Sequence, residues 1–408
     1  VFNLCFNSKK SNWKCPSPMK KLFAACAPGL EPFTANELQQ LSINSNNPIA
    51  EFNSLSKSVK PNQFAGGVEF TGDLEMIYRT NLYLRTASRI LVRFGEFFAS
   101  GFPELKRKVA QLPWENYLRP KQPVALRVTC HKSRLYHSGA VAQRITEAIG
   151  KRLGALPTLV KFDENAAQNP PQLIVVRIAR NRCTISIDSS GAVLHRRGYR
   201  LATAKAPLRE TLAAGMLLAA GWDKKSPLFD PFCGSGTIAI EAALMAKQKA
   251  PGINRKFAFM GWPNFDREKW QNLVAMAKAP AVESAPLITA SDRDAGAIQS
   301  ARENAERTGV KESITLYCRT ISAIDPPGQT GWIVTNPPYG VRLNADKDLR
   351  NLYAKLGSVL RNKCAGWRVA MLCNSDSLLR QTGLKFDTSI LLDNGGVKVT
   401  LAVGKIND

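Results

Sequence analysis

The stretch DPFCGSGT, which runs from Asp230 to Thr237, decides the fold of the C-terminal half of this 408-residue chain. It follows SPLFDPF, which predicts a buried strand, and leads into TIAIEAALMAKQ, which predicts a helix. Gly234 and Gly236 let the backbone turn tightly and let a ligand approach it closely, so we expect a binding site at this turn. Asp230 ends the strand and can hold the turn or accept an amine, and Thr237 is placed to cap the helix.

The rest of residues 207–408 repeats this order of strand and helix. Further strands are predicted at 286–292, 313–319, 332–336 and 367–374, and further helices at 295–309 and 348–363. The strands are apolar on both faces, which is typical of a parallel sheet covered by helices. Near the end of the chain, two strands flank Asp393-Asn394-Gly395-Gly396, a strong hairpin signal. We therefore predict an α/β domain with a Rossmann-like, doubly wound sheet that ends in an antiparallel hairpin.

Residues 19–110 predict a small α+β domain of the ferredoxin-like kind. KKLFAACAPG and GGVEFTG predict strands, and a helix that runs into another strand begins after Asp73, its expected N-cap. Residues 1–18 contain lysines, no acids and no clear periodicity, so we expect a disordered extension with Met19 as the functional start. They also lack the apolar core of a signal peptide.

A second α+β unit is expected at residues 111–190. It begins with a strand at 123–131, continues with a helix capped by Ser138, and ends with two strands joined by a hairpin at 180–182. The following residues, 191–206, are poor in apolar side chains and are expected to link this unit to the C-terminal domain.

The chain is strongly basic, with a formal net charge of +24. From Arg119 to Arg200 there are fifteen Lys and Arg residues against four acids. A local excess of this size favours a polyanionic partner, nucleic acid above all, over a merely solvated basic surface. The candidate phosphate contacts are Lys132, Arg134, Arg196, Arg197 and Arg200.

Composition narrows the chemistry further. The nine cysteines form no C-x-x-C pair and there are only three histidines, so we expect neither a metal site nor a histidine-based triad. Several cysteines lie in apolar runs, which suggests reduced, buried thiols and a cytoplasmic location. No run of about 18 apolar residues predicts a membrane span.

An acid lies at the tip of the second strand of the C-terminal domain, in ITASDRDAGAI. Asp292 is placed there to accept both hydroxyls of a ribose, and Asp294 to cap the next helix. The glycine turn also fits a nicotinamide-binding pattern, but that pattern expects its acid about 20 residues later. Asp292 is 56 residues after Gly236, and no GK[ST] sequence of a P-loop is present. A nucleoside without a pyrophosphate fits better, and S-adenosylmethionine is such a ligand.

The fourth strand of this domain ends in VTNPPYG, residues 334–340. Its two prolines fix φ and cannot donate to a sheet, so carbonyl oxygens there point outward without a strand partner. The amide oxygen of Asn336 and the carbonyl of Pro337 are then two acceptors for an –NH2 group, and the Tyr339 ring offers a face for a base. We predict a cradle that holds an exocyclic amine in line with an activated methyl group. A rigid loop with a surface tyrosine is the simpler alternative, and the upstream motifs disfavour it.

Together these motifs resemble those of class I S-adenosylmethionine-dependent methyltransferases that methylate amines. Longer segments, in order, are similar to the bacterial 23S rRNA guanine-N2 methyltransferase family: GGVEFTGDLEMIYRTNLYLRTASRI, VTCHKSRLYHSGAVAQRI, LHRRGYR, APLRETLAAGMLLAAGW and KAPGINRKFAFMGWPNFDREKW. The resemblance implies an RNA-binding THUMP domain at 111–190 and a methyltransferase domain at 207–408 that acts on N2 of a guanine in large-subunit rRNA. Some relatives carry a second methyltransferase domain; because this chain stops after its hairpin, we expect the single-domain form.

The resemblance also assigns roles by position. The residues that would bind the cofactor are Asp230, Gly234, Gly236, Thr237, Asp292 and Thr320. Those that would hold the target base, and so count as catalytic, are Asn336, Pro337 and Tyr339. One position departs from the family, which usually has an acid near the adenine amine where LYCRTISAI places Thr320. A hydroxyl carries no charge, so the cofactor binds more weakly or Asp325 takes over the role.

Other methyl acceptors are compatible with the same chemistry. Guanine N2 in tRNA and adenine N6 in RNA both suit the Asn-Pro-Pro-Tyr segment, whereas methylation of a protein glutamine does not call for the basic middle region. A non-catalytic RNA-binding assembly factor that kept the fold is the remaining hypothesis, against which the intact motifs argue. The residues do not define an oligomeric state.

Overall fold

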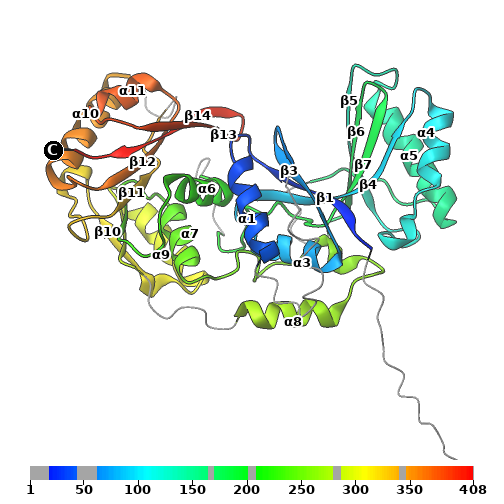
Figure 1. Ribbon diagram of the computed structural model, residues 1–408, viewed down its shortest axis with the longest axis horizontal. Helices are drawn as coiled ribbons and strands as arrows, with labels where there is room; N and C mark the ends of the chain where they lie inside the picture. The colour runs from blue at the N-terminus through cyan, green and yellow to red at the C-terminus, as the bar shows by residue number, and fades with distance from the viewer. Residues whose placement is uncertain are drawn as a thin grey trace, which may run out of the picture.

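The structure is a computed structural model, and it describes residues 18–43, 62–163, 170–200, 208–278, 286–339 and 346–407. Two seven-stranded sheets organise it, one in each half of the chain. Figure 1 shows the C-terminal sheet and its helices at one end, the first strands of the chain in the middle, and β5 to β7 in an arm at the other end. The predicted extension, apart from residue 18, and residues 201–206 of the predicted linker lie outside the described residues.

The N-terminal sheet joins two units that the sequence predicts separately. Its strands are β1 (Lys20–Cys26), β2 (Asn62–Phe64), β3 (Gly67–Gly72), β4 (Ala87–Phe98), β5 (Val124–His131), β6 (Gln172–Ala179) and β7 (Arg182–Asp188), in the order β2-β3-β1-β4-β7-β6-β5. The join is the antiparallel pairing of β4 with β7, from Leu91 opposite Asp188 to Phe98 opposite Arg182. One continuous sheet therefore runs through both units.

Helices cover this sheet, and those over residues 74–83 and 138–153 lie where the sequence predicts a helix, with one cap corrected. They are α1 (Glu31–Ile43), α3 (Leu74–Tyr83), α4 (Phe102–Ala110) and α5 (Ser138–Leu153), and a short 3-10 turn, η1, spans Trp114–Asn116. Asp73 caps α3 as predicted, because its carboxylate accepts a hydrogen bond from the backbone N–H of Met76 at 2.9 Å. The prediction that Ser138 caps α5 is wrong. His137 is the N-cap, and its Nδ1 accepts from the N–H of Ala140 at 3.1 Å.

The predicted hairpin between β6 and β7 is confirmed. Arg180 and Asn181 both adopt a left-handed backbone, with φ of 50° and 62°, and Ala179 pairs with Arg182 across the turn. A two-residue turn with both central φ angles positive matches the twist of the strands it joins.

The C-terminal sheet is the predicted doubly wound sheet. Its strands are β8 (Leu228–Asp230), β9 (Ile288–Asp292), β10 (Ile314–Cys318), β11 (Trp332–Thr335), β12 (Arg368–Cys373), β13 (Thr388–Asn394) and β14 (Val397–Lys405), in the order β10-β9-β8-β11-β12-β14-β13. The first five strands are parallel, and β14 is antiparallel to both β12 and β13. The terminal antiparallel hairpin is thus confirmed.

Helices lie on both faces of this sheet, as Figure 1 shows. The helices are α6 (Glu210–Ala220), α7 (Thr237–Ala246), α9 (Ala295–Arg307), α10 (Asp346–Lys363) and α11 (Asp376–Gln381), with 3-10 turns η3 (Lys311–Ser313) and η4 (Ile321–Ala323). Buried side chains of α6, α7 and α9 form one core with the sheet, and those of α10 and α11 form another. Two separate cores are what a doubly wound arrangement requires.

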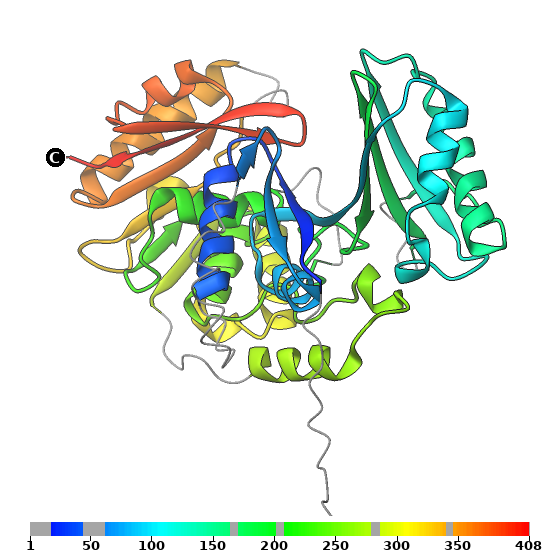
Figure 2. The same cartoon turned by 45° about the vertical axis from the view of Figure 1, so that its right-hand side comes forward.

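One segment of the C-terminal half packs against the N-terminal half. It contains the 3-10 turn η2 (Ala258–Gly261) and helix α8 (Arg267–Lys278). Phe259 is fully buried and stacks on Tyr78 of α3 with ring centroids 4.6 Å apart. Trp262 lies in the same core, which it shares with residues of β1, β3 and β4. This segment therefore ties the two halves together, and Figure 2 shows α8 beneath the first strands of the chain.

Candidate functional site

The candidate site lies at the point where the strand order of the C-terminal sheet reverses, between β8 and β11. β8 ends at Asp230, β9 ends at Asp292, and β11 ends at Thr335, directly before Asn336. Since these strands are parallel, their carboxyl ends meet at one edge of the sheet, where open α/β sheets bind their ligands. The structure thus brings the glycine turn, the strand-end acid and the Asn-Pro-Pro-Tyr segment together.

Asp230 is buried, with 1% of its surface exposed. Its Oδ1 accepts hydrogen bonds from the hydroxyl of Thr335 at 2.8 Å and from the N–H of Phe232 at 3.2 Å. Its Oδ2 is buried without a hydrogen-bond partner in the described part of the chain. The pKa of this carboxyl is raised to about 7, mainly by burial and in small part by the charge of Asp292, against the opposing effect of those two hydrogen bonds. A ligand cation at Oδ2 would satisfy that oxygen and favour the ionised form.

The two glycines of the turn do different work. Gly236 has φ of 82°, and a Cβ there would lie 2.9 Å from the Cβ of Ala301, so glycine lets α7 pack closely on α9. Gly234 has φ of 51°, and a Cβ there would meet nothing within 4 Å, so the space beside its backbone is open. Asn304 of α9 holds the turn by donating to the carbonyl of Ser235 at 3.1 Å.

The predicted capping role of Thr237 is wrong. Thr237 is the first residue of α7, and the N-cap is Gly236, which has no side chain to make a capping bond. The hydroxyl of Thr237 instead accepts a hydrogen bond from Nη2 of Arg200 at 2.6 Å. The side chain therefore faces the linker that precedes this domain.

Asp292 is half-buried and holds the other side of the glycine turn. Its Oδ2 accepts from the N–H of Gly234 at 2.9 Å, and its Oδ1 accepts from the N–H of Asp294 at 3.0 Å. A carboxylate offers about four acceptor positions, so two remain for a ligand such as a ribose diol. Asp294 caps α9 as predicted, accepting from the N–H groups of Gly296 and Ala297.

The Asn-Pro-Pro-Tyr segment presents one open acceptor. The amide oxygen of Asn336 is buried and has no hydrogen-bond partner among the described residues. Pro337 is buried beside it, and the half-buried Tyr339 packs against both hydrophobic cores of the domain. The hydroxyl of Tyr339 accepts a hydrogen bond from Nδ2 of Asn394 at 3.2 Å. The sequence gives no sign of this contact, because there Asn394 is explained by its turn alone.

Thr320 lies at the rim of the site. It is exposed, directly precedes η4, and its side chain makes no capping bond. Asp325, the alternative acceptor for an adenine amine, is also exposed. The Thr320 hydroxyl and the Asp325 carboxylate are therefore both accessible to a ligand, and exposure does not distinguish them.

The five predicted phosphate contacts divide into two groups. Lys132, Arg134 and Arg196 are exposed, so phosphate can reach them. Arg197 and Arg200 are not on the surface: the side chain of Arg197 is 3% exposed and that of Arg200 is 11% exposed. Arg197 and Arg200 are therefore corrections to the predicted set, because their guanidinium groups are engaged inside the protein.

Their partners explain the burial of these two arginines. Arg197 pairs with the fully buried Glu241 of α7 at 3.5 Å and donates to the backbone carbonyl of Arg85 at 2.6 Å. Arg200 pairs with Glu210 of α6 at 3.7 Å, besides its bond to Thr237. From the sequence alone, a linker rich in arginine is expected to be exposed. The structure shows that acids distant in the sequence pair with two of these arginines and bury them.

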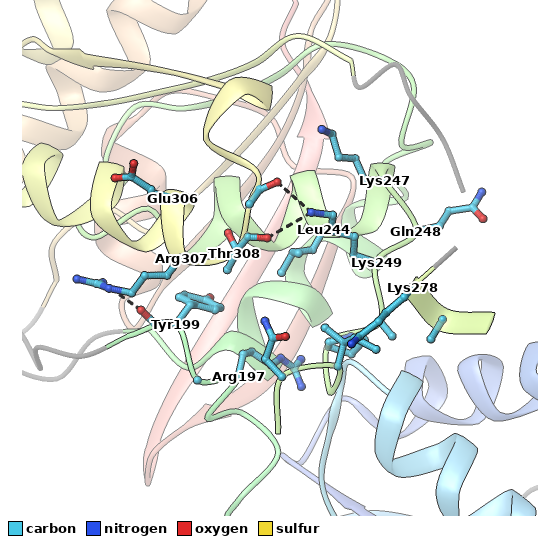
Figure 3. Close-up of a pocket in the computed structure, with 17 residues that line it drawn as sticks. Arg197, Tyr199, Leu244, Lys247, Gln248, Lys249, Lys278, Glu306, Arg307 and Thr308 are labelled. Carbon is cyan, nitrogen blue, oxygen red and sulfur yellow. Dashed lines mark hydrogen bonds between the residues drawn. The ribbon is translucent and has the colours of Figure 1, made fainter. Parts of the chain in front are cut away.

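A cavity of about 660 Å³ lies elsewhere, at the C-terminal ends of α7 and α9 (Figure 3). Lys247 and Lys249 line it, together with Lys278 at the end of α8. Nζ of Lys249 donates to the carbonyls of Thr308 and Gly309, at 3.4 and 2.9 Å, and so caps the end of α9. None of the residues predicted to bind the cofactor or the base lines this cavity.

The doubly wound sheet, the glycine turn with its strand-end acid and the Asn-Pro-Pro-Tyr segment define a methyltransferase. The chain belongs to the RMKL-like methyltransferase family, whose methyltransferase-domain profile matches residues 197–401. A profile described as the RlmL ferredoxin-like domain matches residues 50–91, and a THUMP-domain profile matches residues 99–188. The THUMP match includes α4, which the sequence places in the preceding unit.

Similar proteins cover most of this chain. A Synechocystis protein that carries the name of an RNA methyltransferase is 35% identical over 93% of this chain and 95% of its own length. The ribosomal RNA large subunit methyltransferase K/L of Syntrophotalea carbinolica is 34% identical over 93% of this chain but 53% of its own length. That of Cellvibrio japonicus is 33% identical, over 51% of its own length, so the chain spans about half of these two relatives.

Solved structures share the whole architecture. The crystal structure of SMU.472 complexed with SAH has a TM-score of 0.82 at 30% identity and covers 96% of this chain and 99% of its own. A Listeria monocytogenes structure named as an N6-adenine-specific DNA methylase has a TM-score of 0.81 at 32% identity and covers 95% of this chain and 96% of its own. Within the described ranges, no helix is both long and apolar enough to cross a membrane.

Proposed function

We propose that this protein transfers a methyl group from S-adenosylmethionine to the exocyclic N2 amine of a guanine in RNA, with large-subunit ribosomal RNA as the substrate. The observation that carries the proposal is the buried amide oxygen of Asn336, at the same sheet edge as the carboxylate Oδ2 of Asp230; neither atom has a hydrogen-bond partner among the residues that the structure describes. Buried acceptors without donors are costly, so they favour a ligand that brings N–H groups.

S-adenosylmethionine fits the residues of this edge. Its ammonium group would contact Oδ2 of Asp230, its methionine part would lie in the open space beside Gly234, and its ribose hydroxyls would donate to Asp292. Gly236 keeps the turn close to α9, and the exposed hydroxyl of Thr320 would accept from the adenine amine. When bound, the cofactor supplies a methyl group on a positively charged sulfur. The residues of the chain supply binding, orientation and removal of water.

The target amine would lie at the end of β11. The amide oxygen of Asn336 and the carbonyl of Pro337 would accept its two hydrogens, and the Tyr339 ring would stack on the base. This arrangement turns the nitrogen lone pair toward the methyl group and keeps the base from rotating. The nitrogen can lose a proton to solvent after transfer, so positioning contributes most of the rate.

A guanine in a helix must leave its stack to reach this edge, at a cost of a few kcal/mol. Phosphate contacts made elsewhere on the protein can offset that cost. The THUMP domain supports an RNA substrate, and the exposed Lys132 and Arg134 at its surface, with Arg196 in the linker, are our candidate contacts. We also place the protein in the cytoplasm, where such RNA is assembled.

Ribosomal RNA is favoured by the names of the K/L relatives, and guanine N2 by the resemblance of the sequence segments. Guanine N2 in tRNA is the alternative acceptor for the same chemistry. Adenine N6 is the second candidate, since a similar Listeria structure is named for that activity, although on DNA. A guanine and an adenine both present an exocyclic amine, so the product must be identified directly.

The test is to incubate the protein with labelled S-adenosylmethionine and unmodified ribosomal RNA or tRNA, digest the RNA and identify the labelled nucleoside. N2-methylguanosine from ribosomal RNA supports the proposal, whereas N6-methyladenosine or label in tRNA alone would replace it. Asn336→Ala is expected to lower the rate of transfer by about 100-fold, because the amine loses its orientation. Binding of RNA and of S-adenosylhomocysteine should change little. An equal loss of RNA binding would contradict the proposal that Asn336 orients the target amine.

A further inference from the structure

The turn of the β13–β14 hairpin lies against the predicted base site. Asn394, the last residue of β13, donates from Nδ2 to the hydroxyl of Tyr339 at 3.2 Å. That bond fixes the edge of the ring and occupies its polar atom. A base at this site would therefore meet the face of the ring, as stacking requires.

The hairpin holds Asn394 in a fixed place. Gly395 and Gly396 have φ of 66° and 92°, and Asn394 pairs directly with Val397, so this is a two-residue turn of the tight, left-handed kind. Leu392 on β13 and Val399 on β14 are buried in the core beneath it. Figure 2 shows the hairpin extending from the methyltransferase sheet toward the arm that holds β5 to β7.

A cation lies beside the same turn. Arg209, the N-cap of α6, is exposed, and its Nη2 is 3.5 Å from the position that a Cβ would take at Gly395. It forms no ion pair with an acidic side chain of the described residues. The acid of the turn, Asp393, accepts from the N–H of Gly396 at 2.8 Å and lies opposite Lys398 in the strand register. The guanidinium is thus held beside the turn, and no acid among the described residues neutralises it.

We infer that Asn394 and Arg209 form the mouth of the target-base site: Asn394 positions Tyr339, and Arg209 binds an RNA phosphate next to the flipped nucleotide. A base that leaves its helix keeps its sugar and its two phosphates outside the pocket. A planar guanidinium with several N–H donors suits such a phosphate better than an ammonium group. This inference rests on the proposed function, because it assumes that an RNA base enters at Asn336.

Arg209 is tested by Arg209→Ala and Arg209→Lys in the full chain. We expect Arg209→Ala to raise the KM for RNA by about fivefold and to reduce the slope of log affinity against log salt by about one, with Arg209→Lys in between. The matched control is Arg267→Ala, which removes an exposed arginine at the start of α8, far from the hairpin in Figure 1. If both alanine variants shift RNA binding equally, Arg209 contributes only general charge and the inference fails.

Asn394 is tested by Asn394→Ala and Tyr339→Phe, singly and together. Each removes one end of the hydrogen bond, so each should lower kcat by about tenfold with little change in the KM for S-adenosylmethionine. The double variant should be no slower than either single variant, since one interaction is lost in all three. Additive losses would overturn the positioning role. Thermal unfolding of each variant separates these effects from misfolding.

Two outcomes distinguish a failure of this inference from a failure of the proposed function. If the wild-type protein binds S-adenosylhomocysteine but methylates no RNA, the proposed function fails, while RNA binding by Arg209→Ala still decides the phosphate contact. If the wild-type protein methylates a guanine and the Arg209 and Asn394 variants do so equally well, the proposed function stands and the inference fails.

Discussion

Asp230 is a carboxyl group held in a dry position with no basic side chain bonded to it in the described part of the chain. Its ordinary pKa is 3.8, and burial raises the pKa to about 7 in the folded protein. Between these two pH values the unfolded chain has released this proton and the folded protein has kept it. Asp230 therefore favours the folded state at low pH, and this contribution is lost as the pH rises toward 7.

Replacement of this residue by asparagine tests that account. The asparagine amide keeps the shape and an oxygen acceptor but has no charge, so Asp230→Asn should raise the free energy of unfolding at pH 8, by roughly 1–3 kcal/mol. At pH 4 the two proteins should be nearly equal in stability. Urea unfolding at both pH values measures the difference. A gain of the same size at pH 4 and pH 8 would mean that packing, and not the charge, limits stability here.

The secondary-structure elements show which parts of the fold a sequence reveals. The strands other than β2, and the hairpins β6–β7 and β13–β14, were predictable because alternation, apolar runs and turn signals act over a few residues. The helix α6 gives no such sign, since ETLAAGMLLAAG is apolar or small on nearly every face, as expected for a helix that is buried almost all round. The pairing of β4 with β7 joins residues about 90 apart in the chain, and no local pattern encodes it.

The described part of the linker, residues 191–200, is bound tightly to helix α7 of the methyltransferase domain. Arg197 binds Glu241 of α7, and Arg200 binds Thr237 of the same helix. These two residues are four apart, so both arginines contact one side of α7. Arg197 also reaches the backbone of Arg85 in the N-terminal half. The helix that begins at the glycine turn is thereby fixed to the N-terminal half of the molecule.

Breaking the ion pair of Arg197 and Glu241 should strongly destabilise the folded protein. Arg197→Met leaves a buried carboxylate without its partner, which typically lowers the free energy of unfolding by about 3–5 kcal/mol. Replacing both residues, as in Arg197→Met with Glu241→Met, should restore much of that loss. Arg196→Ala, at the exposed neighbour, should change stability by about 0.5 kcal/mol or less. Chemical unfolding of the four proteins decides; if the double variant is as unstable as the single one, packing around the linker and not the lone charge explains the loss.

At the scale of the whole molecule, some residues of the site could be predicted from the sequence and others could not. Asp230, Asp292 and Asn336 could be placed together in advance, because each ends a strand of one parallel sheet. The positions of Asn394 and Arg209 could not, because Asn394 contacts Tyr339 from the terminal hairpin and Arg209 lies beside that hairpin, at the start of a helix that has no amphipathic pattern. Nor does the sequence predict that a segment of the methyltransferase half would complete the core of the N-terminal half.

That shared core gives a prediction about how the two halves depend on each other. Phe259 is fully buried between Tyr78 and Phe257, with ring centroids 4.6 and 5.2 Å away. Phe259→Ala should therefore cost about 3–5 kcal/mol, and the loss should fall on the N-terminal sheet, because this ring belongs to the core that covers that sheet. Hydrogen exchange should show lost protection in β1, β3 and β4 and retained protection in β8 to β12, while S-adenosylhomocysteine still binds. Phe98→Ala, at a ring that is 54% exposed, is the control and should change neither sheet. Equal loss of protection in both sheets would mean that the halves unfold as one unit and that the segment from η2 to α8 couples them fully.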